Sequence, residues 1–199
     1  MCLKTLCQMV LLTSLSTTPL SKQTLLTPNE TASGPNCSVD VLPPSVQTQL
    51  NTGYALWKIQ DVFSLSASAR RTWEYKKLAK PGECPGIAAG IFEDGSEAYA
   101  VLLVPRARPE RAYRFLVFSN RHAEAAYRVT TVEGSDKGGA QNLFIRSVRM
   151  NDLFDHTSRR KLGITTTEGV VIVESGSSEL CADVFFWTKD GYRHEPMEY

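Results

Sequence analysis

The three histidines and one of the five cysteines are the residues of this sequence that we consider first for acid–base or nucleophilic chemistry. They are His122, His156 directly after Asp155, His194 near the end of the chain, and Cys181 at the start of the apolar run CADVFFW. A hydrolase needs a nucleophile, a base within hydrogen-bond reach and an acid that orients the base. His122 or His156 beside an acid such as Asp155 would suit a hydrolase that cleaves envelope polymers. We keep such a hydrolase as the alternative hypothesis for the function of this protein.

No suitable nucleophile accompanies these histidines in the sequence. The G-x-S-x-G pattern of hydrolases is absent, and the segment 176–180 (GSSEL) lacks the closing glycine. Cys181 lies inside an apolar strand rather than at a helix N-terminus, so we expect a buried free thiol. We therefore predict no catalytic residue and expect the histidines at loops or strand edges.

The sequence also lacks the patterns that hold metals or phosphates. It has no CxxC, and no cysteine and histidine lie one helical turn apart. The glycine-rich segment 134–139 (GSDKGG) lacks Walker spacing and precedes no clear helix. We predict a mobile hairpin loop there, and neither a metal nor a cofactor.

Basic residues form two groups on a chain that is otherwise balanced in charge. The formal net charge is +1, with 22 basic and 21 acidic residues, so no global field favours nucleic acid. We expect solvated faces here and no nucleic-acid partner; a further alternative is an edge that meets anionic cell-wall polymer or an acidic protein. The two groups are Arg106, Arg108, Arg111 and Arg114, then Arg146, Arg149, Arg159, Arg160 and Lys161.

The first residues have the outline of a signal peptide. Lys4 precedes an apolar run from Leu6 to Leu15, and the small residues Ser14 and Ser16 follow the spacing of a cleavage site. We predict a signal peptide over 1–21, a flexible linker rich in Thr, Ser, Pro and Asn over 22–36, and a single domain over 37–199. The run is too short to span a bilayer, so the mature chain is expected in the periplasm or outside the cell. A disordered start or a buried helix are the alternatives.

Two cysteines of the predicted domain are placed for a disulfide. Cys37 lies where order should begin, and Cys84 lies in the loop PGECPG. A bridge between them would tie the start of the domain to its sheet, as is common in exported proteins.

Hydrophobic periodicity predicts an α+β domain. Helices are expected over 42–54, ended by Gly53, and over 64–79, with a strand over 56–62 between them. Period-two runs with turn residues between them then continue to the end of the chain, interrupted by a helix or helical turn over 151–163. The fold class is two short N-terminal helices packed on a long antiparallel β-meander. Its expected strands are 86–92, 97–105, 112–119, 125–133, 142–150, 168–175, 181–188 and 192–196.

The stretch GIFEDGSEAYAVLL resembles the FG-GAP type of repeat, through Gly90, Phe92, Asp94-Gly95 and the run 99–102 (YAVL). In that family alternate side chains of the loop bind calcium, a cation that needs several oxygen ligands. Ile91 and Ala98 stand where the family has its first and last acidic ligands, so the resemblance implies a hairpin that has lost its calcium site.

The wider chain is similar to a group of uncharacterised exported bacterial proteins. The matching features are Trp73, Cys84-Pro85-Gly86, the strand 99–103, and VFFW (184–187) followed by GYR (191–193). This resemblance implies a fold and a compartment and no activity. We predict a non-enzymatic exported binding or interaction domain of the cell envelope, one version of which is an inhibitor or immunity-type protein. Its partner would be an envelope protein or glycan.

Overall fold

The computed structural model describes residues 37–75, 83–93, 95–120, 126–176 and 180–198. All of them belong to one compact unit, Gly34–Tyr199. The predicted signal peptide, the predicted linker and His122 lie outside the described residues.

Five strands form the first sheet, and every pairing in it is antiparallel. Its order is β1-β3-β4-β5, and β2 also pairs with β3. β1 and β2 share one edge of β3, because β2 pairs with residues 96–101 of β3 and β1 with residues 103–105. The strands are β1 (Trp57–Ile59), β2 (Ile87–Glu93), β3 (Ser96–Pro105), β4 (Tyr113–Ser119) and β5 (Arg128–Ser135).

Four strands form the second sheet as a simple antiparallel meander, β6-β7-β8-β9. They are β6 (Leu143–Arg149), β7 (Glu168–Ser175), β8 (Leu180–Thr188) and β9 (Gly191–Glu198). Two short helices, α3 (Met150–Leu153) and α4 (His156–Leu162), lie between β6 and β7 in the chain.

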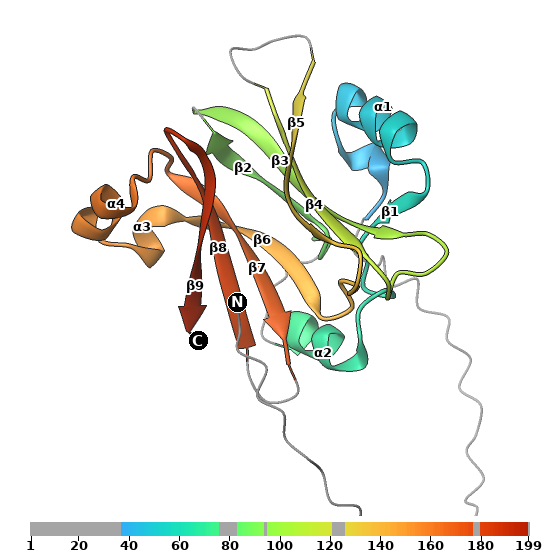
Figure 1. Cartoon of the computed structure of the whole chain (residues 1–199). Helices are drawn as coiled ribbons and strands as arrows, with labels where there is room; N and C mark the ends of the chain where they lie inside the picture. Colours follow the sequence, from blue (N-terminus) through green and yellow to red (C-terminus); the bar gives the residue numbers. More distant parts are fainter. Residues whose placement is uncertain (1–36, 76–82, 94, 121–125, 177–179, 199) are drawn as a thin grey trace, which may run out of the picture. The chain divides into compact units, whose positions relative to one another are not determined.

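The two sheets pack face to face around a shared core (Figure 1). Leu102, Phe115 and Val117 of the first sheet and Ile172 and Phe185 of the second belong to one cluster of buried side chains. The rings of Phe115 and Phe185 meet edge to face, with centroids 5.2 Å apart. Such contacts between inner faces are the basis of a β-sandwich.

A helix covers the outer face of each sheet. The 3-10 turn η1 (Val39–Val41) and helix α1 (Pro44–Gly53) lie on the first sheet, and α2 (Ala67–Tyr75) lies on the second (Figure 1). The centre of each sheet is therefore covered on both faces, which explains why β3 contains five successive fully or nearly fully buried residues, 100–104.

Local sequence accounts for both covering helices. Pro44 occupies the first position of α1, where its missing N–H costs nothing, and Val46 and Leu50 point from successive turns into the core. At the start of α2 the Ser66 hydroxyl accepts a hydrogen bond from the Ala69 N–H at 3.2 Å. Trp73, 3% exposed, packs from α2 against Phe144 of β6 with ring centroids 5.1 Å apart.

The structure confirms the mixed helix and strand composition in outline and corrects its arrangement. The molecule is mostly β, and the predicted single meander is wrong, because the chain leaves the first sheet after β5 and starts a second one. The glycine-rich segment 134–139 consequently comprises the end of β5 and the start of a connection between the sheets, and it is not a hairpin. The connection enters the core: Ala140 is fully buried, and the Gln60 amide donates a hydrogen bond to its carbonyl at 2.6 Å.

Among the described residues, no helix is both long and apolar enough to cross a bilayer.

Candidate anion-binding pocket

A pocket of about 430 Å³ lies between the C-terminal end of α4 and the turn that joins β8 to β9. This volume is within the roughly 300–1,000 Å³ of typical small-molecule sites. In Figure 1 the C-terminal end of α4 leads into the chain segment beside that turn. The lining residues are Arg159 to Thr165 on the helix side and Thr188, Lys189, Asp190 and Arg193 on the hairpin side.

The helix side of the pocket follows from how α4 begins and ends. The Asp155 carboxylate caps the helix by accepting a hydrogen bond from the Ser158 N–H at 2.7 Å. This bond is the main reason that the pKa of Asp155 lies below its ordinary value. The helix ends at Gly163, whose φ of 71° is the left-handed conformation that suits glycine. Its last turn carries three cations, a placement that the helix dipole favours.

The hairpin side of the pocket is a two-residue turn. Thr188 pairs with Gly191, which leaves Lys189 and Asp190 at the tip. The Thr188 hydroxyl donates to the Gly191 carbonyl at 2.9 Å and accepts from the Asp190 N–H at 3.2 Å. The turn is thus held by its own hydrogen bonds, and the side chains at its tip remain exposed.

Backbone contacts join the two sides of the pocket. Ile164, directly after the helix, forms a β-bridge with Thr188. The Thr165 N–H and hydroxyl both donate to the Trp187 carbonyl, at 3.1 and 3.2 Å. The end of α4 is therefore fixed to the end of β8, and the spacing of the two walls does not depend on flexible side chains.

Five cations and one acid line the pocket. Arg159 is committed to structure, because its guanidinium donates to the Asn151 side chain and to the Thr166 carbonyl. Arg193 lies 3.3 Å from the Asp190 carboxylate. The other three cations, Arg160, Lys161 and Lys189, are exposed and make no ion pair with any described residue.

These charges give the pocket a local excess of four positive charges, five cations less one carboxylate, on a chain whose net charge is only +1. Concentrated charge of one sign in a concave site attracts ligands of the opposite sign. Arginine and lysine remain charged at neutral pH and donate charge-assisted hydrogen bonds to phosphate, sulfate or carboxylate oxygens. The arrangement is suited to holding an anionic group.

Neither cysteine of the predicted disulfide pair lines this pocket. Cys37 precedes η1 and Cys84 precedes β2, and the two lie at bonding distance with Cα atoms 5.1 Å apart. Cys84 is 4% exposed and belongs to the cluster under α1. The pair thus joins the helical cover of the first sheet to the loop that enters the sheet.

The prediction for Cys181 is wrong. This cysteine is half-buried and disulfide-bonded rather than a buried free thiol. The sequence showed an apolar strand around it, but only half of the side chains of such a strand need face a core.

The two described histidines lie at separate places in the fold, in α4 and in β9. His156 is exposed in the first turn of α4, and the neighbouring Asp155 is engaged as the cap of that helix. His194 stacks on Phe185 with centroids 5.3 Å apart and lies 3.6 Å from Asp183 across the strand pair. Neither histidine lines the pocket, and His122 lies outside the described residues. Within the described part of the chain, no group of three or more metal-ligating side chains gathers.

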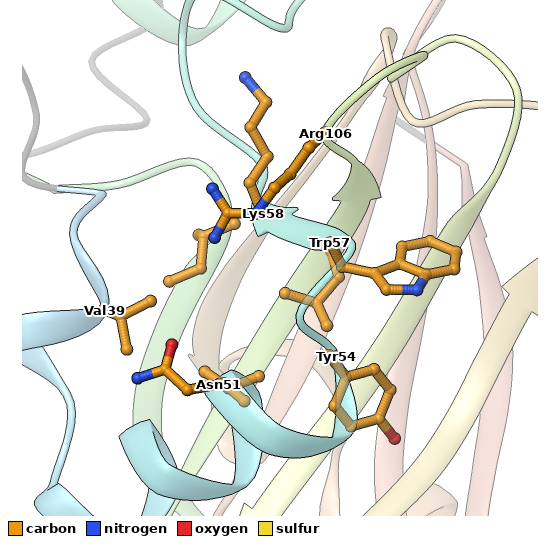
Figure 2. Close-up of a pocket in the computed structure, with 9 residues that line it drawn as sticks. Val39, Asn51, Tyr54, Trp57, Lys58 and Arg106 are labelled. Carbon is orange, nitrogen blue, oxygen red and sulfur yellow. The ribbon is translucent and has the colours of Figure 1, made fainter.

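A second hollow lies between α1 and β1, where Tyr54, Trp57, Lys58 and Arg106 surround it (Figure 2). Its volume of about 10 Å³ is enough for a single water molecule at most, so this hollow does not suit a larger ligand. The nearby Arg114 guanidinium stacks over the Trp57 ring at 5.0 Å and pairs with Asp136. This arginine of the first basic group is therefore structural.

The hairpin formed by β2 and β3 has no calcium-type arrangement among its described side chains. Glu93 is fully buried and accepts a hydrogen bond from the Ser119 hydroxyl at 2.7 Å, so it points into the sheet. The Ile91 N–H donates to the Glu168 carboxylate of β7 at 2.7 Å, which ties the two sheets together. Asp94 lies outside the described residues.

The sequence indicated one wall of the pocket and missed the other. The sequence predicts the basic run Arg159–Lys161 to be a solvated face. It also indicates the turn Asp190-Gly191, but it does not predict that Lys189 and Arg193 lie near the basic run. The missing signal was the β-bridge between Ile164 and Thr188, a contact that no local pattern predicts.

Comparisons with protein-family models, with curated proteins and with solved structures found no significant match to this chain.

Proposed function

We propose that this protein is an exported, non-enzymatic binding domain that holds an anionic group of an envelope protein or glycan in the pocket between α4 and the β8–β9 turn. The observation that supports the proposal most directly is the set of three exposed cations without ion-pair partners among the described residues. They are Arg160 and Lys161 on one wall and Lys189 on the other.

The pocket lining supports binding rather than catalysis. Both of its hydroxyl groups are engaged with backbone carbonyls, that of Thr165 with Trp187 and that of Thr188 with Gly191. Its one carboxylate, that of Asp190, is paired with Arg193. Such a lining attracts negative charge, and it offers no nucleophile beside a free base.

The proposed compartment is supported by the cysteines and by the amino-terminal pattern. Cys37 and Cys84 lie at bonding distance in the structure, and structural disulfides are typical of proteins that fold outside the cytoplasm. We expect the chain, made with its own amino-terminus in an export-competent bacterium, to appear outside the cytoplasm as a shortened mature form. A full-length chain with Cys37 and Cys84 both alkylated without reductant would contradict this part of the proposal.

Chromatography on immobilised heparin, a polyanionic glycan, tests the binding function. The full chain is compared with the double variant K161Q/K189Q, which removes one free cation from each wall. A matched control, R128Q/K137Q, removes two exposed cations elsewhere and changes the net charge equally. We expect the pocket variant to elute at clearly lower salt than the control, because each lost contact reduces the salt-dependent part of binding. Equal elution of the two variants would overturn the proposal.

A further inference from the structure

We infer that the pocket selects a ligand group with two or more negative charges, of the phosphoryl type, over a single carboxylate. The inference rests on the proposed function above and specifies the ligand of the same site. It depends on two features: a carboxylate that the protein itself places in the pocket, and free cations on both walls.

Asp190 already occupies the position that a ligand carboxylate would take beside Arg193. The Arg193 guanidinium and the Asp190 carboxylate lie 3.3 Å apart, and both side chains are 58% exposed. Asp190 is held there by the turn, since its N–H donates to the Thr188 hydroxyl. Arg193 is therefore already balanced by an internal carboxylate, and a ligand must obtain its contacts from the cations that remain.

The cations that remain require more charge than one carboxylate carries. Arg160 and Lys161 belong to the helix wall, and Lys189 belongs to the hairpin wall. A phosphoryl group carries about −1.5 to −2 charges at neutral pH and has three acceptor oxygens. It is thus able to accept hydrogen bonds from both walls together, where a carboxylate has only two oxygens and one charge. Charge and number of donors both favour the phosphoryl group.

The pocket also has room for the chemical group that carries the phosphate. Its volume is about 430 Å³, and two of its lining residues are apolar. They are Leu162, which is half-buried, and Ile164, which is 9% exposed. These apolar side chains belong to the helix wall of the pocket. We infer a phosphate attached to a compact organic group, either on a soluble or polymeric molecule or on a lipid headgroup.

Isothermal titration of the full chain with three probes at one low ionic strength tests the inference. The probes are acetate, inorganic phosphate and inorganic pyrophosphate. We expect pyrophosphate to bind about tenfold or more tighter than acetate, the scale of one additional charge contact near a protein surface. The variant D190N should strengthen the binding of both anions and widen this ratio, because the repulsion that it removes grows with the charge of the ligand. It keeps a hairpin turn, because Asn-Gly is favoured at such tips.

The outcomes separate this inference from the proposed function. If none of the probes binds, or if K161Q/K189Q binds them as well as R128Q/K137Q does, the pocket is not an anion site and both ideas fail. If acetate and pyrophosphate bind equally tightly through the pocket, the proposed function stands and the selectivity is wrong. An unchanged ratio in D190N would refute the role of the internal carboxylate.

Vesicles that contain phosphatidic acid, a lipid with a phosphomonoester headgroup, identify where the phosphate resides. Retention of the full chain on these vesicles, released by pyrophosphate and reduced in K161Q/K189Q, places the phosphate on a lipid. Pyrophosphate binding without retention on vesicles places it on a soluble or polymer-borne group. Vesicle retention that K161Q/K189Q shares equally with R128Q/K137Q would contradict a pocket-based interaction.

Discussion

Removal of the Cys37–Cys84 pair should cost much of the stability of this domain. The two cysteines are separated by 47 residues in sequence and their Cα atoms by 5.1 Å. In the chain-entropy treatment, a cross-link that closes a loop of this length destabilises the unfolded state by about 4 kcal/mol. For a domain of this size, that corresponds to a fall in melting temperature of roughly 8–16 °C.

The change to make is the double variant C37A/C84A in the full chain. Substitution is preferable to reduction, because Cys181 is also disulfide-bonded and a reductant would break more than one bridge. Alanine avoids placing a polar hydroxyl at position 84, where the side chain is 4% exposed. Urea denaturation followed by circular dichroism gives the free energy of unfolding, and calorimetry gives the melting temperature.

A single variant separates the cross-link from local packing. C37A breaks the same bridge but leaves the Cys84 thiol in its buried position, with its sulfur 3.4 Å from the Gln60 carbonyl. If the cross-link accounts for most of the stability that the two cysteines contribute, C37A and C37A/C84A should lose similar free energies of unfolding. A loss below about 1 kcal/mol in the double variant would refute the chain-entropy argument for this bridge. Alkylation of both cysteines in the unreduced wild-type protein would show that the bridge does not form.

Two further predictions concern the backbone and the start of α4. Gly169→Ala should destabilise the protein by roughly 1–3 kcal/mol in urea denaturation. A Cβ at this position would lie 2.5 Å from the Phe185 carbonyl and 2.6 Å from the Met150 methyl. Gly53→Ala is the matched control and should be neutral or stabilising, because a Cβ there would have no atom within 4 Å. Asp155→Asn keeps the cap acceptor and removes its charge. Because the pKa of Asp155 is lowered in the folded protein, its charge stabilises the fold above the ordinary pKa of 3.8. This stabilisation is lost as the pH falls through the lower pKa of the folded protein. The melting temperatures of wild type and variant should therefore differ at pH 6 and converge at strongly acidic pH. A constant difference across that range would contradict the assignment.

The strands that were predicted best are those whose ends carry turn residues. The run 168–175 was predicted and observed as β7 with the same bounds, and its neighbour β8 differs by one residue. Alternation and turn chemistry act within a few residues, so one sequence is enough to reveal them. The helix predicted over 42–54 is α1, which begins two residues later, at Pro44.

The division into two sheets could not be obtained from local patterns. Residues 101–104 of β3 are all buried, and a run of this kind is compatible with a strand in any sheet that is covered on both faces. The element that separates the sheets depends on a long-range contact, the hydrogen bond from Gln60 to the carbonyl of Ala140. A buried glutamine and a surface glutamine look alike in a sequence.

The pocket was half predictable for a similar reason. The basic run 159–161 is evident from composition, and the cap at Asp155 follows a known helix-start preference. The second wall comes from a different hairpin, placed by the bridge between Ile164 and Thr188. Whether cations face solvent or a shared pocket is decided by that tertiary contact and not by their own spacing.

The order of the two sheets along the chain determines how the protein assembles as it is made. A chain that leaves a ribosome or a secretion channel amino-terminus first releases residues 57–135, and with them all strands of the first sheet, before any strand of the second. Until residues 143–198 follow, Leu102, Phe115 and Val117 have no partner sheet to cover them. At synthesis rates of about 5–20 residues per second, this incomplete chain with its exposed apolar side chains persists for several seconds. Synthesis of this protein therefore places its greatest demand on chaperones during that interval, before the second sheet emerges.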